Sequence, residues 1–249
     1  MTGVKDILLE VKRLAKDNGL SEPYIVGGLP RDKILHRIRK VEDVDLTSGD
    51  ESIHHLAELT AQSFKVNPIR FPDGHYQVYI EKIKYDFSSN YNSPDAKYFL
   101  EKAGVVNPSP MLLELFSRDF TCNTLILPLA LRKIMDPTGL AIDDIKKKII
   151  RTPLPPRITL RDDTKRVVRV IYLAAKLGFA VEDDIITWVK DHPEKIKEEV
   201  SVGFAKRKLA DATRADIRKT IQLMNAMNLW SVIGIPRILV EHMGAARVV

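Results

Sequence analysis

The chain has 249 residues and a mass of 28.2 kDa, which is enough for one large core or two smaller ones, and we expect two. Its composition of 45% hydrophobic and 29% charged residues excludes a disordered chain. A membrane-spanning helix needs about 20 consecutive apolar residues, and no apolar run in the sequence approaches this length. The single cysteine, Cys122, excludes a disulfide framework and a thiolate zinc site, and is typical of a protein of the reducing cytoplasm.

Basic residues outnumber acidic ones, 39 against 33, and most of the excess lies after Thr152. The net charge of +6 and the pI near 9.2 favour an anionic partner such as nucleic acid. This signal is weak by itself, because many proteins with other partners have a pI this high.

The first half of the chain alternates between helical and extended patterns. Apolar residues recur at helical spacing in some segments, and alternate with polar residues in others. In chain order the patterns predict a helix over 4–18, a strand over 24–26, a helix over 30–36, a strand over 41–47, a helix over 52–63, a strand pair within 75–88, a loop over 89–110 and a helix over 111–131.

The proline-rich segment 152–156 interrupts this alternation, and only helical patterns follow it. The predicted helices cover 161–178, 182–191, 194–211 and 214–228. The sequence therefore predicts the α+β class, with a small mixed domain over 1–151 and an all-helical domain over 152–249.

Two aspartates share one face of the predicted strand Val41–Thr47. Asp43 and Asp45 project to the same side because they are two residues apart, while the residues between and after them enter the core. Two carboxylates this close repel each other unless a cation neutralises them, and hard oxygen ligands suit Mg²⁺. An isolated pair of this kind is more often a solvated strand face, so the neighbouring residues must decide.

A glycine turn between a strand and a helix precedes the aspartate pair. Gly27 and Gly28 allow backbone amides to approach an anion, and the start of the following helix favours phosphate. Arg31, in that helix, is placed to bind a phosphate oxygen. The turn alone is a weak signal, but together with the aspartates it predicts a phosphate cradle beside a metal site.

Asp86 is a third candidate carboxylate, on the strand face opposite Tyr85 and Phe87. If this strand neighbours the one that carries Asp43, three carboxylates can surround two metal ions about 3.5–4 Å apart, as in-line phosphoryl or nucleotidyl transfer requires. The alternative is an exposed aspartate on an edge strand.

Five motifs follow one another between residues 22 and 180. They are YIVGGLPRD (24–32), EDVDLT (42–47), RDFTCNTL (118–125), DPTGL (136–140) with IRTP (150–153), and DDTKRVVR (162–169). In type and order they resemble the motifs of the class II tRNA nucleotidyltransferases (CCA-adding enzymes) and bacterial poly(A) polymerases, within the polymerase-β-like superfamily. Each motif alone is weak, but the ordered set is specific.

The resemblance implies a catalytic head over 1–151 and a helical neck over 152–249, without the body and tail regions that commonly follow. It also implies a role for each matching residue. Asp43 and Asp45 would hold the catalytic metals, with Asp86 as the third catalytic carboxylate. Nucleotide-binding roles fall to Gly27, Gly28, Arg31 and Arg118 for the phosphates and sugar, and to Asp163, Arg166 and Arg169 for the base.

The implied activity is a Mg²⁺-dependent attack of an RNA 3′-hydroxyl on the α-phosphorus of CTP or ATP, with release of pyrophosphate. The favoured function is CCA addition or repair at the tRNA 3′ end, in the cytoplasm. One alternative is a poly(A) polymerase or A-adding enzyme that uses ATP only, and another is a non-catalytic RNA-binding relative. Asp163 and Arg166, three residues apart on a helix, place an acceptor beside a donor, which suits the edges of cytosine or adenine.

Five features depart from the family pattern. Pro30 replaces a usual valine, Ser117 replaces a common arginine, and Asp162 replaces a glutamate. Tyr172 stands where another arginine is frequent, and the segment 85–90 lacks an arginine often found near that point. None of these changes removes a predicted metal ligand, but they leave the choice between CTP and ATP open.

Overall fold

The computed structural model describes residues 3–38, 40–237 and 240, and the chain divides into two compact units, 1–142 and 143–249. The division lies within α6 (Ala141–Lys147), earlier in the chain than the predicted boundary at Thr152. The first unit combines helices with a sheet and the second is mainly helical, which confirms the predicted α+β class.

A six-stranded sheet lies at the centre of the first unit, in the order β3-β4-β5-β2-β1-β6. β2 and β5 pair in parallel, and the other neighbours pair in antiparallel fashion. The strands are β1 (Tyr24–Val26), β2 (Asp43–Thr47), β3 (Ile69–Arg70), β4 (Tyr76–Ile80), β5 (Ile83–Phe87) and β6 (Leu127–Pro128).

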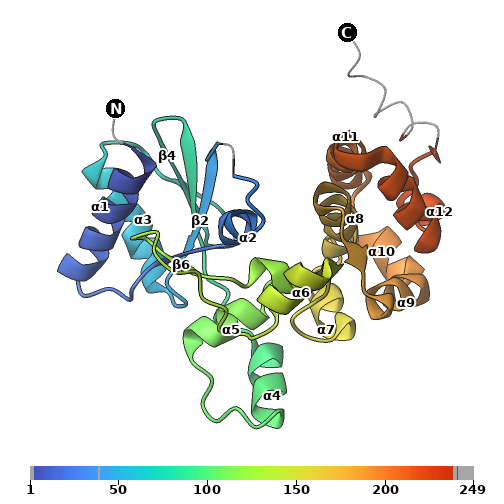
Figure 1. Cartoon of the computed structure of the whole chain (residues 1–249), viewed down its shortest axis with the longest axis horizontal. Coiled ribbons are helices and arrows are strands. Elements are labelled where there is room, and N and C mark those ends of the chain that lie inside the picture. The colour runs from blue at the N-terminus through green and yellow to red at the C-terminus, as the bar shows by residue number, and fades with distance from the viewer. Residues whose placement is uncertain (1–2, 39, 238–239, 241–249) are drawn as a thin grey trace. The chain divides into compact units, whose positions relative to one another are not determined.

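Two helices, α1 (Val4–Asp17) and α3 (Ser52–Ser63), cover one face of this sheet (Figure 1). Val44, Tyr85 and Phe87 are fully buried in the core beneath them. Because side chains alternate along a strand, the residues between these core positions point to the opposite face of the sheet. That face therefore receives the aspartates of β2 and β5.

The remaining elements of the first unit differ in part from the predicted ones. They are α2 (Gly28–Ile34), α4 (Pro94–Lys102), α5 (Pro110–Phe116) and the 3₁₀ turn η1 (Thr121–Asn123). The prediction of a loop over 89–110 was wrong, since α4 lies within it. The Ser93 hydroxyl caps this helix by accepting a hydrogen bond from the Ala96 N–H group at 3.3 Å.

The predicted helix over 111–131 was also wrong after Phe116. Beyond this point the Asp119 carboxylate accepts hydrogen bonds from the Phe120 N–H group (2.8 Å) and from Asn123 Nδ2 (2.9 Å). A side chain that bonds its own local segment in this way competes with helical hydrogen bonding. The chain therefore turns through η1 and adds β6 to the sheet, although its apolar spacing is helical.

The second unit is built around two long helices that pack on each other, α8 (Arg166–Leu177) and α11 (Val202–Ala226). A short parallel pair, β7 (Ile149–Ile150) with β8 (Ala180–Val181), was not predicted. The other helices are α7 (Pro156–Asp162), α9 (Asp183–Asp191), α10 (Pro193–Glu199) and α12 (Trp230–Ile233).

Helix boundaries in this unit lie elsewhere than predicted. The helix expected over 161–178 is interrupted, since Asp163 has extended backbone (φ −144°) between α7 and α8. The break expected between 211 and 214 is instead a non-helical residue, Asp216, inside α11. Among the described residues, no helix has both the length and the apolar character needed to cross a membrane.

Candidate active site

Three carboxylates gather on the sheet face opposite the helix-covered core. Asp43 and Asp45 project from β2 and Asp86 from β5, and the parallel register sets Asp45 directly across from Asp86. One oxygen from each side chain lies within 4.8 Å of the others. Asp86 Oδ1 is buried and has no hydrogen-bond partner in the described part of the chain. An all-oxygen set with an unfilled buried acceptor fits a hard divalent cation.

Asp45 is partly buried beside two other carboxylates. Burial raises the pKa of Asp45 to about 6, and the charges of Asp43 and Asp86 add to this effect while Arg118 opposes it. Burial also raises the pKa of Asp43. The folded chain thus holds carboxylates that repel one another, and a bound cation would reduce this repulsion.

Lys84 lies between two of these carboxylates, and none of the motifs in the sequence points to it. It stands across from Asp43 in the register, and its Nζ is 3.1 Å from Asp43 Oδ2 and 2.6 Å from Asp86 Oδ2. Burial opposes the charge on Lys84, but the hydrogen bonds to Asp86 and Asp43 outweigh it and raise the pKa of the lysine. The spacing Lys84-x-Asp86 is the signal that could have revealed this contact, because it places both side chains on one face.

Gly27 closes the site on the β1 side, next to Asp45. The backbone of Gly27 has φ +73°, a conformation that residues with a side chain rarely adopt. Gly27 directly precedes α2. A Cβ atom at this position would lie 2.5 Å from Asp45 Oδ2. Glycine is therefore required here both for the turn and for the space that Asp45 occupies.

We expect Gly27→Ala to weaken metal binding as well as the fold. Gly19→Ala is the matched control, because Gly19 has φ +65° and its Cβ would meet no described atom within 4 Å. Gly19→Ala should lower the free energy of unfolding by about 1–2 kcal/mol for its positive φ. Gly27→Ala should lower it further, because its backbone (φ +73°, ψ −131°) lies outside the left-handed helical region and its Cβ would meet Asp45. Only Gly27→Ala should also weaken Mn²⁺ binding, measured by calorimetry. Equal Mn²⁺ affinities in the two variants would contradict this account of Gly27.

Arg118 faces Asp45 from the end of α5 and is held by a fully buried carboxylate. Glu114 Oε1 accepts a hydrogen bond from Arg118 Nη2 at 2.9 Å, and its other oxygen accepts the N–H group of Asn90. Arg118 Nε is buried and finds no hydrogen-bond acceptor among the described residues. Arg118 thus has a fixed position beside the carboxylates and an unused donor. Glu114 was missed from the sequence, although a lone acidic residue four positions before Arg118 in an apolar helix was a readable signal.

Arg31 is buried beneath the glycine turn, with 3% of its surface exposed. Its Nε donates to Asp32 Oδ1 at 2.8 Å and its Nη1 donates to Asn123 Oδ1 at 2.6 Å, and the guanidinium also lies beside Gly28. In this arrangement Arg31 ties α2 to η1. A contact between Arg31 and a phosphate stays a prediction.

The predicted base-reading residues belong to the second unit, where Asp163 lies between α7 and α8 while Arg166 and Arg169 lie in the first turns of α8. Asp163 Oδ1 accepts the N–H group of Lys165 at 3.1 Å, and Asp163 Oδ2 lies 3.8 Å from Arg166 Nε. Arg166 also donates from Nη1 to the carbonyl oxygen of Thr159 at 3.2 Å. Arg169 is exposed one turn further along α8. The structure therefore brings Asp163 and Arg166 together, and their role in base recognition stays a prediction.

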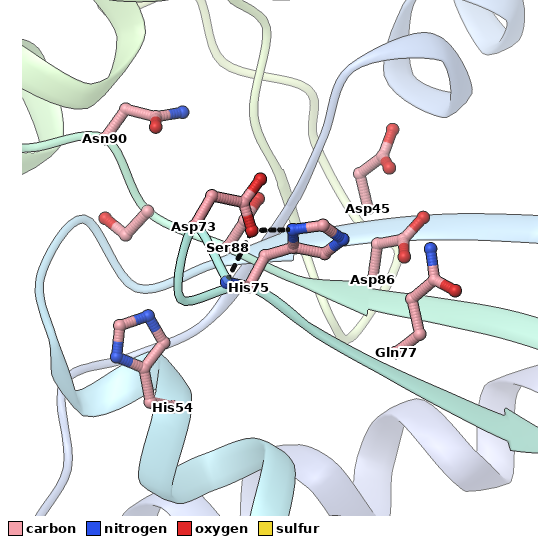
Figure 2. Close-up of a pocket in the computed structure, with 9 residues that line it drawn as sticks. Asp45, His54, Asp73, His75, Gln77, Asp86, Ser88 and Asn90 are labelled. Carbon is pink, nitrogen blue, oxygen red and sulfur yellow. Dashed lines mark hydrogen bonds and ion pairs between the residues drawn. The ribbon is translucent and has the colours of Figure 1, made fainter. Parts of the chain in front are cut away.

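A polar cavity of about 340 Å³ opens beside the carboxylates at β4 (Figure 2). In Figure 2 the His75 ring lies between Asp73 and the carboxylates of Asp45 and Asp86. His75 Nδ1 is 2.5 Å from Asp73 Oδ1, and the ring stacks on Phe71 with 4.1 Å between centroids. The cavity adjoins the carboxylates, but the motifs in the sequence do not indicate its histidines.

Comparison with known proteins agrees with this geometry. A family model described as the poly A polymerase head domain matches residues 23–151, which is more than half of the chain. The chain belongs to this family. The match contains all the predicted site residues of the first unit, and Asp163, Arg166 and Arg169 lie after it.

The chain is also similar to several proteins named as tRNA nucleotidyltransferases. It is 28% identical to tRNA nucleotidyltransferase cca1 of Schizosaccharomyces pombe over 222 residues, which are 80% of this chain and 43% of that protein. It is 30% identical to a CC-adding tRNA nucleotidyltransferase of Halalkalibacterium halodurans over 166 residues, covering 67% of this chain and 37% of that one.

A similar solved structure is a tRNA nucleotidyltransferase complexed with a primer tRNA and an incoming ATP analog. The TM-score is 0.69 at 26% identity, and the match covers 90% of this chain and 62% of that one. The chain thus spans less than two thirds of the length of these relatives. The resemblance stated from the motifs is confirmed.

Proposed function

We propose that this chain contains the catalytic and base-selecting parts of a template-independent nucleotidyltransferase that adds CMP and AMP to the 3′ end of tRNA. The observation that carries the proposal is the carboxylate triad of Asp43, Asp45 and Asp86, set between a glycine turn and a fixed arginine. The relative solved with a primer tRNA and an ATP analog supports the choice of substrates.

The three carboxylates and Arg118 of the first unit would have separate tasks in this reaction. Asp43, Asp45 and Asp86 would hold Mg²⁺, which when bound supplies the positive charge that activates the RNA 3′-hydroxyl and stabilises charge on the phosphates. Arg118, anchored by Glu114, offers its unused Nε donor to the triphosphate. The 3′-hydroxyl releases its proton to solvent and its oxygen bonds to the α-phosphorus. The bond from this phosphorus to the oxygen that bridges it to the β-phosphorus breaks, and pyrophosphate leaves with that oxygen.

Asp163 and Arg166 would select the base without a nucleic-acid template. The Asp163 carboxylate is an acceptor and the Arg166 guanidinium a donor, with 3.8 Å between Asp163 Oδ2 and Arg166 Nε. Such a pair suits the adjacent donor and acceptor on the Watson–Crick edge of cytosine or adenine. Both side chains have further local contacts, to Lys165 and Thr159, and these restrict their orientation before a base arrives.

The partners of this reaction would be tRNA, CTP and ATP, and we place it in the cytoplasm. The only cysteine, Cys122, is fully buried, as suits a chain that needs no disulfide. Because the carboxylate triad and Arg118 are all present, we favour an enzyme over a non-catalytic RNA-binding relative.

The substrate choice is tested with tRNA transcripts that lack the terminal CCA or end in CC. Each is incubated with CTP alone, ATP alone or both, and the products are sized on a gel. The proposal expects CTP to extend the first transcript by two nucleotides and ATP to complete the second. Use of ATP only would support the A-adding or poly(A) alternative, and failure to add the final A would indicate a CC-adding enzyme like the Halalkalibacterium relative. Loss of all incorporation would overturn the proposal.

A further inference from the structure

We propose that Lys84 is an internal counter-cation of the carboxylate triad, which occupies the space between Asp43 and Asp86 and competes there with a divalent cation. The inference rests on the proposed function in one respect, namely that the triad binds a metal. The new element is that Lys84 determines how tightly the triad binds the metal.

The first argument is the strand register. Lys84 and Asp86 are two residues apart on β5 and point to the same face, and across β2 they stand opposite Asp43 and Asp45. The sheet thus places two cross-strand pairs side by side, Lys84 with Asp43 and Asp86 with Asp45. The backbone pairing itself directs the ammonium group to the metal-binding face.

The second argument is the pair of short contacts that the ammonium makes. Its nitrogen is 2.6 Å from Asp86 Oδ2 and 3.1 Å from Asp43 Oδ2, so it hydrogen-bonds two of the three candidate ligands. A divalent cation that takes the same oxygens would stand close to a like charge in a partly buried site, where screening by water is weak. Lys84 must therefore move away, or the cation must bind with fewer ligands.

The third argument is that Lys84 has a route out of the site. Its side chain is 27% exposed, and its four-carbon stem is flexible. In the metal-free protein the ammonium offsets the repulsion among Asp43, Asp45 and Asp86 and stabilises the fold. It does so at the expense of metal affinity, so divalent cations would bind tightly only when a triphosphate adds further ligands.

The test measures Mn²⁺ binding by electron paramagnetic resonance of the free ion, on the full chain without nucleotide. Lys84→Met removes the charge and keeps the length of the side chain. The matched control is Lys97→Met, which removes an exposed lysine whose Nζ is 3.9 Å from Glu101 on α4. We expect Lys84→Met to bind Mn²⁺ about tenfold more tightly than the wild type, a change of about 1.4 kcal/mol, and Lys97→Met to bind it unchanged. In EDTA, Lys84→Met should melt at a lower temperature than the wild type, and saturating Mn²⁺ should remove this difference.

Unchanged or weaker Mn²⁺ binding by a folded Lys84→Met variant would overturn the inference. In a separate titration with CTP at saturating Mn²⁺, a loss of CTP binding by Lys84→Met would overturn it too, because Lys84 would then bind the triphosphate instead of competing with the metal. If Lys84→Met does not fold, Lys84→Gln serves the same test, with circular dichroism as the check of folding. If the wild type binds no Mn²⁺ either without nucleotide or in the presence of CTP, the proposed function itself fails.

Discussion

Asp45→Asn is expected to reduce nucleotide incorporation by at least about a thousandfold and, in the absence of metal, to make the protein more stable. The loss of activity follows from the position of Asp45 between Asp86, Gly27 and Arg118. Asparagine keeps the shape of the side chain, so the loss would reflect the missing charge. Incorporation of labelled CMP into a tRNA transcript measures this effect.

The gain in stability follows from the raised pKa of Asp45. Because burial raises this pKa to about 6, the folded chain binds the proton more tightly than the unfolded chain does. The resulting stabilisation is complete below pH 4 and is lost as the pH rises through 6. At pH 7 the ionised carboxylate therefore costs the wild type about 3 kcal/mol that asparagine avoids.

Urea unfolding in EDTA at several pH values measures this gain. The advantage of Asp45→Asn should be near zero at pH 4 and complete at pH 7. Asp17→Asn is the control, because Asp17 pairs with Arg13 on the exposed side of α1. A stability gain that does not change with pH would contradict the electrostatic explanation, and near-normal CMP incorporation would contradict the assignment of Asp45 to the metal.

Glu114→Ala is expected to lower the free energy of unfolding by about 3–5 kcal/mol and to weaken CTP binding. Glu114 is completely buried, and its loss leaves the guanidinium of Arg118 and the N–H group of Asn90 without their acceptor. Arg118 would then lose its fixed position beside Asp45. Glu114→Gln should be milder, since the amide oxygen can still accept one of these hydrogen bonds.

Stability is measured by urea unfolding, and the position of Arg118 by the KM for CTP. Glu101→Ala, on the exposed surface of α4, is the control and should change neither quantity. If Glu114→Ala lowers stability but leaves the KM unchanged, Glu114 supports the core only. Because a merely destabilised variant has normal kinetics while it remains folded, the KM distinguishes the two roles.

The sequence allowed much of the first unit to be predicted, because alternation along β2 and β5 is strong. Asp43, Asp45 and Asp86 alternate with residues that prove to be fully buried, such as Val44 and Tyr85. What alternation cannot reveal is which strands are neighbours. The meeting of Asp86 with Asp45 depends on a parallel pairing between strands that are distant in the sequence.

The residues that were missed are charged side chains whose roles depend on tertiary contacts. Lys84 resembles a solvated lysine until the strand register is known, and the buried contacts of Glu114 with Arg118 and Asn90 become visible only in the folded chain. The helix expected beyond Phe116 failed for a related reason. There the Asp119 side chain bonds the local backbone, and apolar periodicity contains no information on such bonds.

The parallel pairing of β2 with β5 also determines when the site can form during folding. β4 and β5 are joined by a tight turn and can pair at once, whereas β2 must wait for α3 and the strands after it to cross over the sheet. Asp43 and Asp45 are on the chain long before Asp86 reaches them. A metal ion bound by all three carboxylates would therefore report that β2 and β5 have paired, since only this long-range contact brings Asp86 to Asp43 and Asp45.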